Sequence, residues 1–172
     1  MVIIIEGIDR VGKTTLAERL SRKLNIPIFK KERIAGNEAD DLDTTLINYG
    51  NATGLVDMWN WSGFTQDIIV DRFHWTEAVY GKIERHNSSP EFMSIVESRM
   101  ELKKEKYLVI LMVPTDIEWS SEQHGKDLSE HNEMFRQLFI HSKLEVYCGN
   151  YNTIDDIVAH VGNRLRMEKE YN

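Results

Sequence analysis

Short apolar runs alternate along the chain with longer segments in which apolar residues recur every three or four positions. The runs predict five buried strands, at 2–5, 26–29, 68–70, 107–113 and 146–148. The segments with helical spacing predict helices at 13–24, 75–86, 90–104, 129–143 and 153–165. Alternating strands and helices favour a parallel sheet covered by helices on both faces. The predicted fold class is therefore α/β, with one five-stranded parallel sheet between two helical layers.

Several helix ends have residue signals of their own. Asn25 ends the first helix, Ser89 and Pro90 suit the N-cap and first position of the helix at 90–104, and a capping box at 153–156 begins the last helix. The segment 34–62 is less regular. We expect it to hold one or two helices, around 42–47 and 55–61.

Composition narrows the class of protein. A chain of 172 residues with 41% hydrophobic and 28% charged residues suits one globular domain, predicted to span 1–172. The net charge of −7 disfavours nucleic acid and anionic membranes as partners. No apolar run is long enough to cross a bilayer, and the start does not resemble a signal peptide. A single cysteine, Cys148, allows no internal disulfide and is expected to pack in a buried strand. The predicted location is cytoplasmic.

The charge is unevenly distributed. The first 33 residues hold eight basic and four acidic side chains, a net charge of +4, so the remainder carries −11. This basic region contains Gly7-Ile-Asp-Arg-Val-Gly12-Lys13-Thr14, which fits the phosphate-loop pattern G-x-x-x-x-G-K-[ST] in full. It lies between a predicted strand and a predicted helix, the context that the pattern requires.

Each fixed position of the loop has a physical role. The glycines let consecutive N–H groups point at phosphate oxygens, Lys13 adds a positive charge, and Thr14 offers a hydroxyl to Mg²⁺. The helix that follows contributes the positive end of its dipole. The predicted nucleotide-phosphate contacts are Gly7, Ile8, Asp9, Arg10, Val11, Gly12, Lys13, Thr14 and Thr15.

The stretch from Val2 to Thr15 resembles the opening of thymidylate kinases and, more broadly, of nucleoside and nucleoside-monophosphate kinases. Ile68-Ile-Val-Asp71-Arg72 resembles a second signature of this group, an Asp-Arg pair after a strand. The resemblance implies a P-loop kinase fold, ATP as phosphoryl donor and Mg²⁺. Enzymes of this group often dimerise, so it also allows a homodimer.

The resemblance also assigns roles on the donor side. Lys13 and Arg10 would stabilise the transferring phosphoryl group, and Thr14 and Asp71 would hold Mg²⁺. Members with an arginine inside the phosphate loop lack one in the lid, and the expected lid here, about 119–129, contains Lys126 but no arginine. His124 and Lys126 lie in this expected lid and could approach phosphates, but a solvated loop is the favoured expectation for both.

On the acceptor side, the resemblance implies that Arg72 and Arg33 bind phosphate, with Arg72 also acting in transfer. Asp9 would lie near the sugar 3′-hydroxyl, and Tyr80 would lie against the sugar. Glu32 matches the position where deoxynucleoside kinases keep a general base, and it is also compatible with the monophosphate kinase pattern.

One departure from the family concerns the acceptor. No Lys or Arg occurs between Arg33 and Arg72, where thymidylate kinases usually place a further phosphate-binding arginine beside an aromatic that stacks on the base. Trp59 and Trp61 are candidates for that stack, but residues two apart cannot share a helix face, so at least one is expected in the core.

Three functions remain open from the sequence. The leading hypothesis is phosphoryl transfer from ATP to a deoxynucleoside monophosphate such as dTMP, giving the diphosphate. An alternative is a deoxynucleoside kinase that phosphorylates a 5′-hydroxyl with Glu32 as base. A second alternative is a nucleotide-binding ATPase with a regulatory role.

Overall fold

The computed structural model describes residues 1–30, 42–85 and 90–171. Its centre is one parallel five-stranded sheet in the order β2-β3-β1-β4-β5. The strands are β1 (Val2–Glu6), β2 (Ile28–Lys30), β3 (Ile68–Asp71), β4 (Tyr107–Met112) and β5 (Val146–Gly149). The predicted fold class is confirmed.

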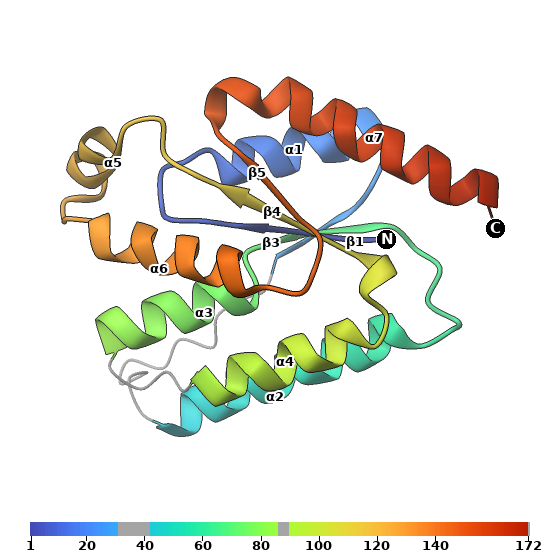
Figure 1. Cartoon of the computed structure of the whole chain (residues 1–172), viewed down its shortest axis with the longest axis horizontal. Coiled ribbons are helices and arrows are strands. Elements are labelled where there is room, and N and C mark those ends of the chain that lie inside the picture. The colour runs from blue at the N-terminus through green and yellow to red at the C-terminus, as the bar shows by residue number, and fades with distance from the viewer. Residues whose placement is uncertain (31–41, 86–89, 172) are drawn as a thin grey trace.

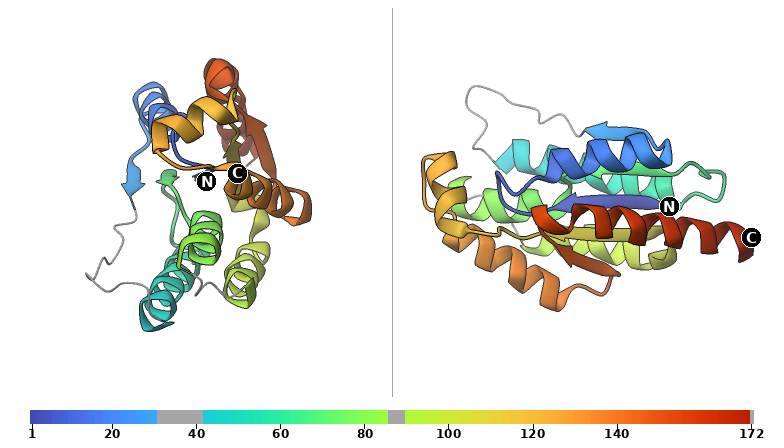
Figure 2. Two further views of the ribbon diagram at one scale, coloured as in Figure 1. Left: turned by 90° about the vertical axis from the view of Figure 1, so that its left-hand side faces the viewer. Right: turned by 90° about the horizontal axis from the view of Figure 1, so that it is seen from above.

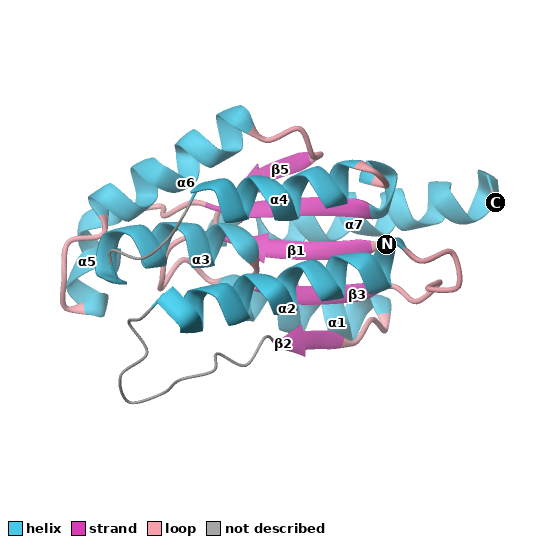
Figure 3. Cartoon of the chain, turned by 90° about the horizontal axis from the view of Figure 1, so that it is seen from below, coloured by secondary structure: helices cyan, strands magenta, loops and turns pink. Residues whose placement is uncertain are grey.

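Helices cover both faces of this sheet (Figures 1 and 2). One face carries α1 (Lys13–Leu24) and α7 (Ile154–Tyr171). Figure 3 shows the other face, crossed by α2 (Leu42–Asn60), α3 (His74–Tyr80), α4 (Pro90–Glu101) and α6 (Ser129–His141). The short helix α5 (Ile117–His124) lies beyond the carboxyl ends of the strands. In the described ranges, no helix combines the length and apolarity needed to cross a membrane.

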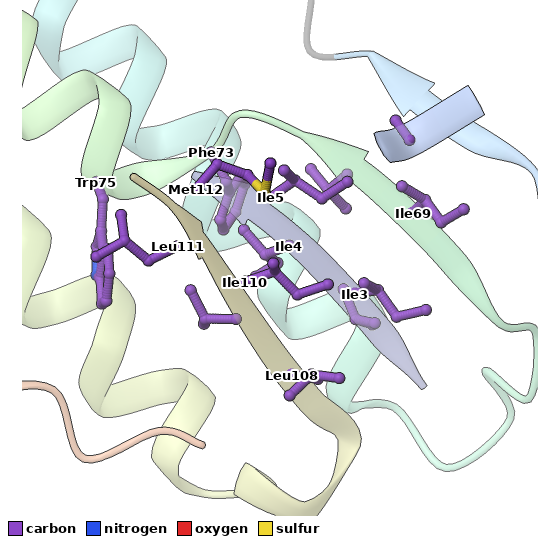
Figure 4. Packing of buried hydrophobic residues seen from close by; sticks show 14 of the residues in the cluster. Ile3, Ile4, Ile5, Ile69, Phe73, Trp75, Leu108, Ile110, Leu111 and Met112 are labelled. Carbon is purple, nitrogen blue, oxygen red and sulfur yellow. The ribbon is translucent and has the colours of Figure 1, made fainter. Parts of the chain in front are cut away.

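Buried strands explain the continuous apolar runs in the sequence. Every residue of β1 and β4 is buried, because both strands lie inside the sheet with helices on each side. Their isoleucines and leucines pack with Phe73 and Trp75 in one continuous core (Figure 4). The register pairs Ile5 with Asp71 and Glu6 with Leu111, so the carboxyl ends of β1, β3 and β4 meet at one edge.

The described part of the irregular segment holds one continuous helix, α2, in agreement with the one or two helices expected there. Two other local expectations need correction. The helix expected over 75–86 ends as α-helix at Tyr80 and continues as a π-helical turn, Gly81–Arg85. The capping box before α7 is formed by Asn150 and Thr153 around a 3-10 turn, so Asn150 is the cap.

Cys148 was expected to be buried, and this expectation is wrong, because its side chain is exposed. The physical reason is that β5 is the outermost strand on one side of the sheet, so part of the surface of this strand is not covered by neighbouring elements. Asn25 does end α1, in the left-handed conformation (φ 55°) that favours asparagine. Ser89 lies outside the described residues.

Candidate active site

The phosphate loop connects β1 to α1 and depends on its two fixed glycines. Gly7 has φ 134°, and a Cβ there would lie 2.2 Å from the backbone oxygen of Met112. Gly12 has φ 90°, and a Cβ there would lie 2.8 Å from the ring of Tyr151. Both positions therefore require glycine for conformation and for space.

Two arginines near the loop also adopt left-handed conformations, Arg10 with φ 67° and Arg72 with φ 70°. For a residue with a long side chain this conformation costs about 1–3 kcal/mol, and such residues cluster at functional sites. Arg10 lies in the loop and Arg72 directly follows β3, so both are at the carboxyl edge of the sheet, where open α/β folds bind ligands.

Lys13 is buried beneath the loop. Its Nζ donates to the carbonyl oxygen of Ile8 and lies 3.8 Å from a carboxylate oxygen of Asp9. Burial, together with the positive charge of Arg72, lowers the pKa of Lys13 from 10.5 to about 8. An anionic ligand would stabilise the charged form, so this lysine is suited to binding phosphate.

Asp9 joins the loop to two other parts of the chain. Its Oδ1 lies 2.6 Å from Nη2 of Arg72, and its Oδ2 lies 2.8 Å from Nε2 of His124. Its backbone N–H donates to the hydroxyl of Tyr80 at 3.0 Å. Although burial raises the pKa of Asp9, the neighbouring Arg72, Lys13 and His124 hold it below its ordinary value. Asp9 is therefore ionised at neutral pH.

A cavity of about 410 Å³ opens above these groups. It is lined by Asp9, Arg10, Gly12, Lys13, Thr14, Thr15, Arg72 and His124. The first intrahelical bond of α1 runs from Leu16 N to Gly12 O at 2.9 Å, so the preceding N–H groups have no partner within the helix. Unpaired N–H groups, a helix dipole and three basic side chains make this cavity suitable for phosphate.

Thr14 and Asp71 form a second pair at the loop. The Thr14 hydroxyl donates to Oδ2 of Asp71 at 3.1 Å, while Oδ1 of Asp71 is buried and has no hydrogen-bond partner among the described residues. A hydroxyl beside an unsatisfied carboxylate oxygen fits Mg²⁺, which prefers oxygen ligands and keeps several waters. Within the described ranges no cluster of three or more His, Cys, Asp or Glu could hold a metal ion, so a cation here would take its remaining ligands from substrate and water.

The sequence did not indicate a role for Glu6, but its carboxylate connects the end of β1 to the start of α3. Its Oε1 accepts from the backbone N–H groups of Phe73 (3.1 Å) and Trp75 (3.0 Å). Its Oε2 accepts from the N–H (3.1 Å) and hydroxyl (2.5 Å) of Thr76. The side chain is fully buried and caps the start of α3 directly after Arg72. The one sequence signal was an acid ending a continuous apolar run.

The remaining predicted acceptor residues differ in their placement. Tyr80 is buried, 6% exposed, with its ring 4.8 Å from that of His131. Glu32 and Arg33 lie outside the described residues. A role for these three in binding acceptor stays a prediction.

Neither tryptophan can stack on a base in this cavity, so that expectation is corrected. Trp59 is completely buried, packed against Phe73 with ring centroids 5.2 Å apart. This confirms that at least one tryptophan is in the core. Trp61 is 66% exposed but follows the carboxyl end of α2, where its carbonyl accepts from Lys106 beside the start of β4. The start of β4 is the opposite edge of the sheet from the phosphate loop.

The expected lid contains α5 and the connection to α6. His124, expected in a solvated loop, is instead the last residue of α5 and contacts Asp9. Lys126 follows in the connection and forms an ion pair with Glu84 of the π-helical turn. Its Nζ also lies 5.9 Å from the centre of the Tyr80 ring.

No protein-family model matches the chain. The SPbeta prophage-derived uncharacterized protein YorR of Bacillus subtilis strain 168 is 26% identical over 153 residues, covering 85% of this chain and 86% of YorR.

Solved structures extend this comparison. A crystal structure of YorR in complex with phosphorylated GDP matches with a TM-score of 0.73 and 21% identity, covering 100% of this chain and 99% of YorR. Thymidylate kinase from Candida albicans matches with a TM-score of 0.60 and 19% identity over 99% and 93% of the two chains. Deoxyadenosine kinase from M. mycoides, with dCMP and dCDP bound, matches with a TM-score of 0.57 and 14% identity over 97% and 100%. At these identities the likeness establishes the fold.

Proposed function

Because the chain has the thymidylate kinase-like P-loop kinase fold, we propose that it is an enzyme that transfers a phosphoryl group between nucleotides. The donor is ATP, and the leading acceptor is a deoxynucleoside monophosphate of the dTMP type. The observation that carries the proposal is the complete phosphate loop with buried Lys13, facing Arg72 across one cavity. The whole chain is proposed as one kinase domain, with a lid at about 119–129.

Each charged group has a part in this mechanism. The loop N–H groups and Lys13 bind the donor phosphates, while Arg10 and Arg72 neutralise charge that spreads over the transferring phosphoryl group. Thr14 and Asp71 would hold Mg²⁺, which neutralises phosphate charge when bound. Arg72 also orients the acceptor, and Asp9 holds the guanidinium in place before substrate arrives.

Two observations bear on the acceptor. A nucleoside acceptor benefits from a general base, the role predicted for Glu32, which lies outside the described residues. Asp9, which lines the described cavity, is ion-paired and has a lowered pKa, which makes it a weak base. A monophosphate acceptor is already anionic and needs none. The deoxynucleoside alternative rests on the deoxyadenosine kinase neighbour and on the absence of Lys or Arg between Arg33 and Arg72.

The acceptor can be identified by incubating the protein with Mg²⁺ and either ATP or GTP, together with each deoxynucleoside monophosphate or deoxynucleoside. Guanine nucleotides belong in the panel because the YorR structure contains phosphorylated GDP. We expect ADP formation that depends on a monophosphate, with the matching diphosphate as product in chromatography. Turnover of nucleosides alone would replace this proposal with the nucleoside kinase. Nucleotide hydrolysis at one slow rate with every acceptor would favour the regulatory ATPase.

Replacing Arg72 with methionine should reduce kcat/KM for the acceptor by about 30- to 150-fold, because a charge-assisted hydrogen bond to phosphate is worth about 2–3 kcal/mol. Steady-state kinetics with varied acceptor and saturating ATP provide the measurement. Arg22→Met is the matched control, since Arg22 is exposed on α1 and pairs only with Glu18 at 3.8 Å among the described contacts. Equal kinetics for Arg72→Met and Arg22→Met would remove Arg72 from the site.

A further inference from the structure

The end of α5 brings a histidine into the phosphate cavity. The Asp116 side chain caps the start of this helix by accepting from Trp119 N at 3.0 Å. Gly125 closes its end with φ 77° and a hydrogen bond from its N–H to Ser121 O at 2.9 Å. Both ends of the helix are therefore fixed, and His124 is held where its ring lines the same cavity as Lys13.

The partner of His124 fixes the position of its proton. Asp9 has a lowered pKa and is ionised, so its Oδ2 can only accept a hydrogen bond. Nε2 of His124, at 2.8 Å, must therefore carry the hydrogen and donate it. The other ring nitrogen, Nδ1, is buried and has no hydrogen-bond partner in the part of the chain that the structure describes. The imidazole thus presents an N–H donor in the cavity.

The carboxylate of Asp9 contacts two side chains that a phosphate group would also attract. Arg72 reaches Oδ1 from the end of β3, and His124 reaches Oδ2 from the end of α5. Carboxylate and phosphate oxygens accept the same charge-assisted hydrogen bonds. The Asp9 carboxylate therefore forms an ion pair with Arg72 and a hydrogen bond with His124, and both partners line the same cavity as the phosphate loop.

The other basic residue of the expected lid does not share this position. Lys126 pairs with Glu84, and the same Glu84 carboxylate lies 3.1 Å from Nε2 of His131. These contacts hold Lys126 on the π-helical turn. Among the residues described in 117–128, His124 is the one that lines the phosphate cavity.

We propose that His124 is a catalytic residue that donates its Nε2–H to an oxygen of the transferring phosphoryl group, exchanging Asp9 for substrate. This inference rests on the proposed phosphoryl transfer and adds a contact from α5 to it. The interaction is a hydrogen bond, so no proton is transferred and no covalent bond to the protein forms. The N–H of His124 would stabilise the negative charge that develops on the phosphoryl oxygens in the transition state.

Three variants test this contact. His124→Ala should lower kcat by about 10- to 100-fold and change KM for the acceptor by less than about threefold, since the lost donor acts mainly in the transition state. His124→Gln retains an N–H near the Nε2 position and should keep kcat within about fivefold of the wild type. His141→Ala is the matched control, because His141 also ends a helix but is exposed. Thermal unfolding of all variants checks that each is folded.

Binding of inorganic tripolyphosphate, measured by calorimetry, tests His124 without acceptor or turnover. We expect His124→Ala to weaken binding by about 5- to 10-fold and His124→Gln by less than about threefold. Equal defects in the Ala and Gln variants, or unchanged kcat and binding in His124→Ala, would overturn the inference. If the wild-type protein turns over no acceptor, the proposed function fails, while the tripolyphosphate comparison still decides whether His124 contacts phosphate.

Discussion

Replacing Lys13 with methionine is expected to lower kcat by about 10²- to 10³-fold, the usual effect of removing one preorganised charge that faces a developing anion. Methionine keeps the length and apolar part of the side chain, so the space beneath the phosphate loop stays filled. The loss is therefore electrostatic. Turnover with ATP and the preferred acceptor provides the measurement.

The burial of Lys13 gives this prediction a pH dependence. Only the charged lysine binds phosphate well, and its pKa in the free protein is about 8. We expect kcat/KM for ATP to fall as the pH rises above about 8, since this parameter reports groups of the free enzyme. The Lys13→Met variant should lack that decrease.

The same substitution should make the protein more stable at neutral pH. In the unfolded chain Lys13 keeps its ordinary pKa of 10.5, whereas in the folded protein the pKa is about 8. Between these values the unfolded chain binds more protons, so stability rises with pH, and below both values the buried charge opposes folding. Lys13→Met removes this cost and should raise the free energy of unfolding at pH 7 by about 3 kcal/mol.

Urea denaturation at pH 7 measures this gain, and Lys23→Met, at an exposed position of the same helix, is the control. A variant that loses activity and also stability would show that Lys13 has a structural role here. A variant with wild-type activity would contradict the assignment of the phosphate site. The expected combination, less activity with more stability, identifies a charge that is retained for binding rather than for folding.

Local patterns were sufficient for the sheet and the phosphate loop. Buried strands require continuous apolar runs, and the loop requires Gly7 and Gly12 at positive φ, so both leave signals in adjacent residues. The hydrogen bond between Thr14 and Asp71 brings together two residues that the sequence assigned to one site, and their role in holding Mg²⁺ stays a prediction. The contact follows from the parallel register, which places the end of β3 beside the end of β1.

Contacts between distant segments were not predictable in this way. His124 meets Asp9 across 115 residues. Its place in the expected lid allowed an approach to phosphate, but the residues next to it in the sequence do not indicate the contact with Asp9. Trp61 has an aromatic side chain that could stack on a base. The direction of α2, however, places it beside the start of β4, at the opposite ends of the strands from the phosphate loop. Cys148 lies in an apolar run that identifies a strand without revealing that the strand is an edge.

Glu6 is the most consequential of these distant contacts, and replacing it with alanine should lower the free energy of unfolding by about 3–5 kcal/mol. The substitution leaves three backbone N–H groups and one hydroxyl at the start of α3 without their acceptor. Each unsatisfied buried donor costs about 1–3 kcal/mol, and partial entry of water reduces the sum. Chemical denaturation measures the loss, with Glu18→Ala as control on the exposed surface of α1.

Glu6→Gln removes the carboxylate but keeps the shape of the side chain, so it tests the two contributions separately. The amide oxygen can still accept two hydrogen bonds, but the NH₂ group faces donors, so we expect a smaller loss of about 1.5–3 kcal/mol. Because Glu6 holds Phe73, the residue after Arg72, this folded variant should also show a higher KM for the acceptor while KM for ATP changes little. Equal stability of the Gln, Ala and wild-type proteins would refute the capping role. If Glu6→Gln has a lower stability but an unchanged KM for the acceptor, Glu6 stabilises the fold only, and the contact with Asp9 alone positions Arg72.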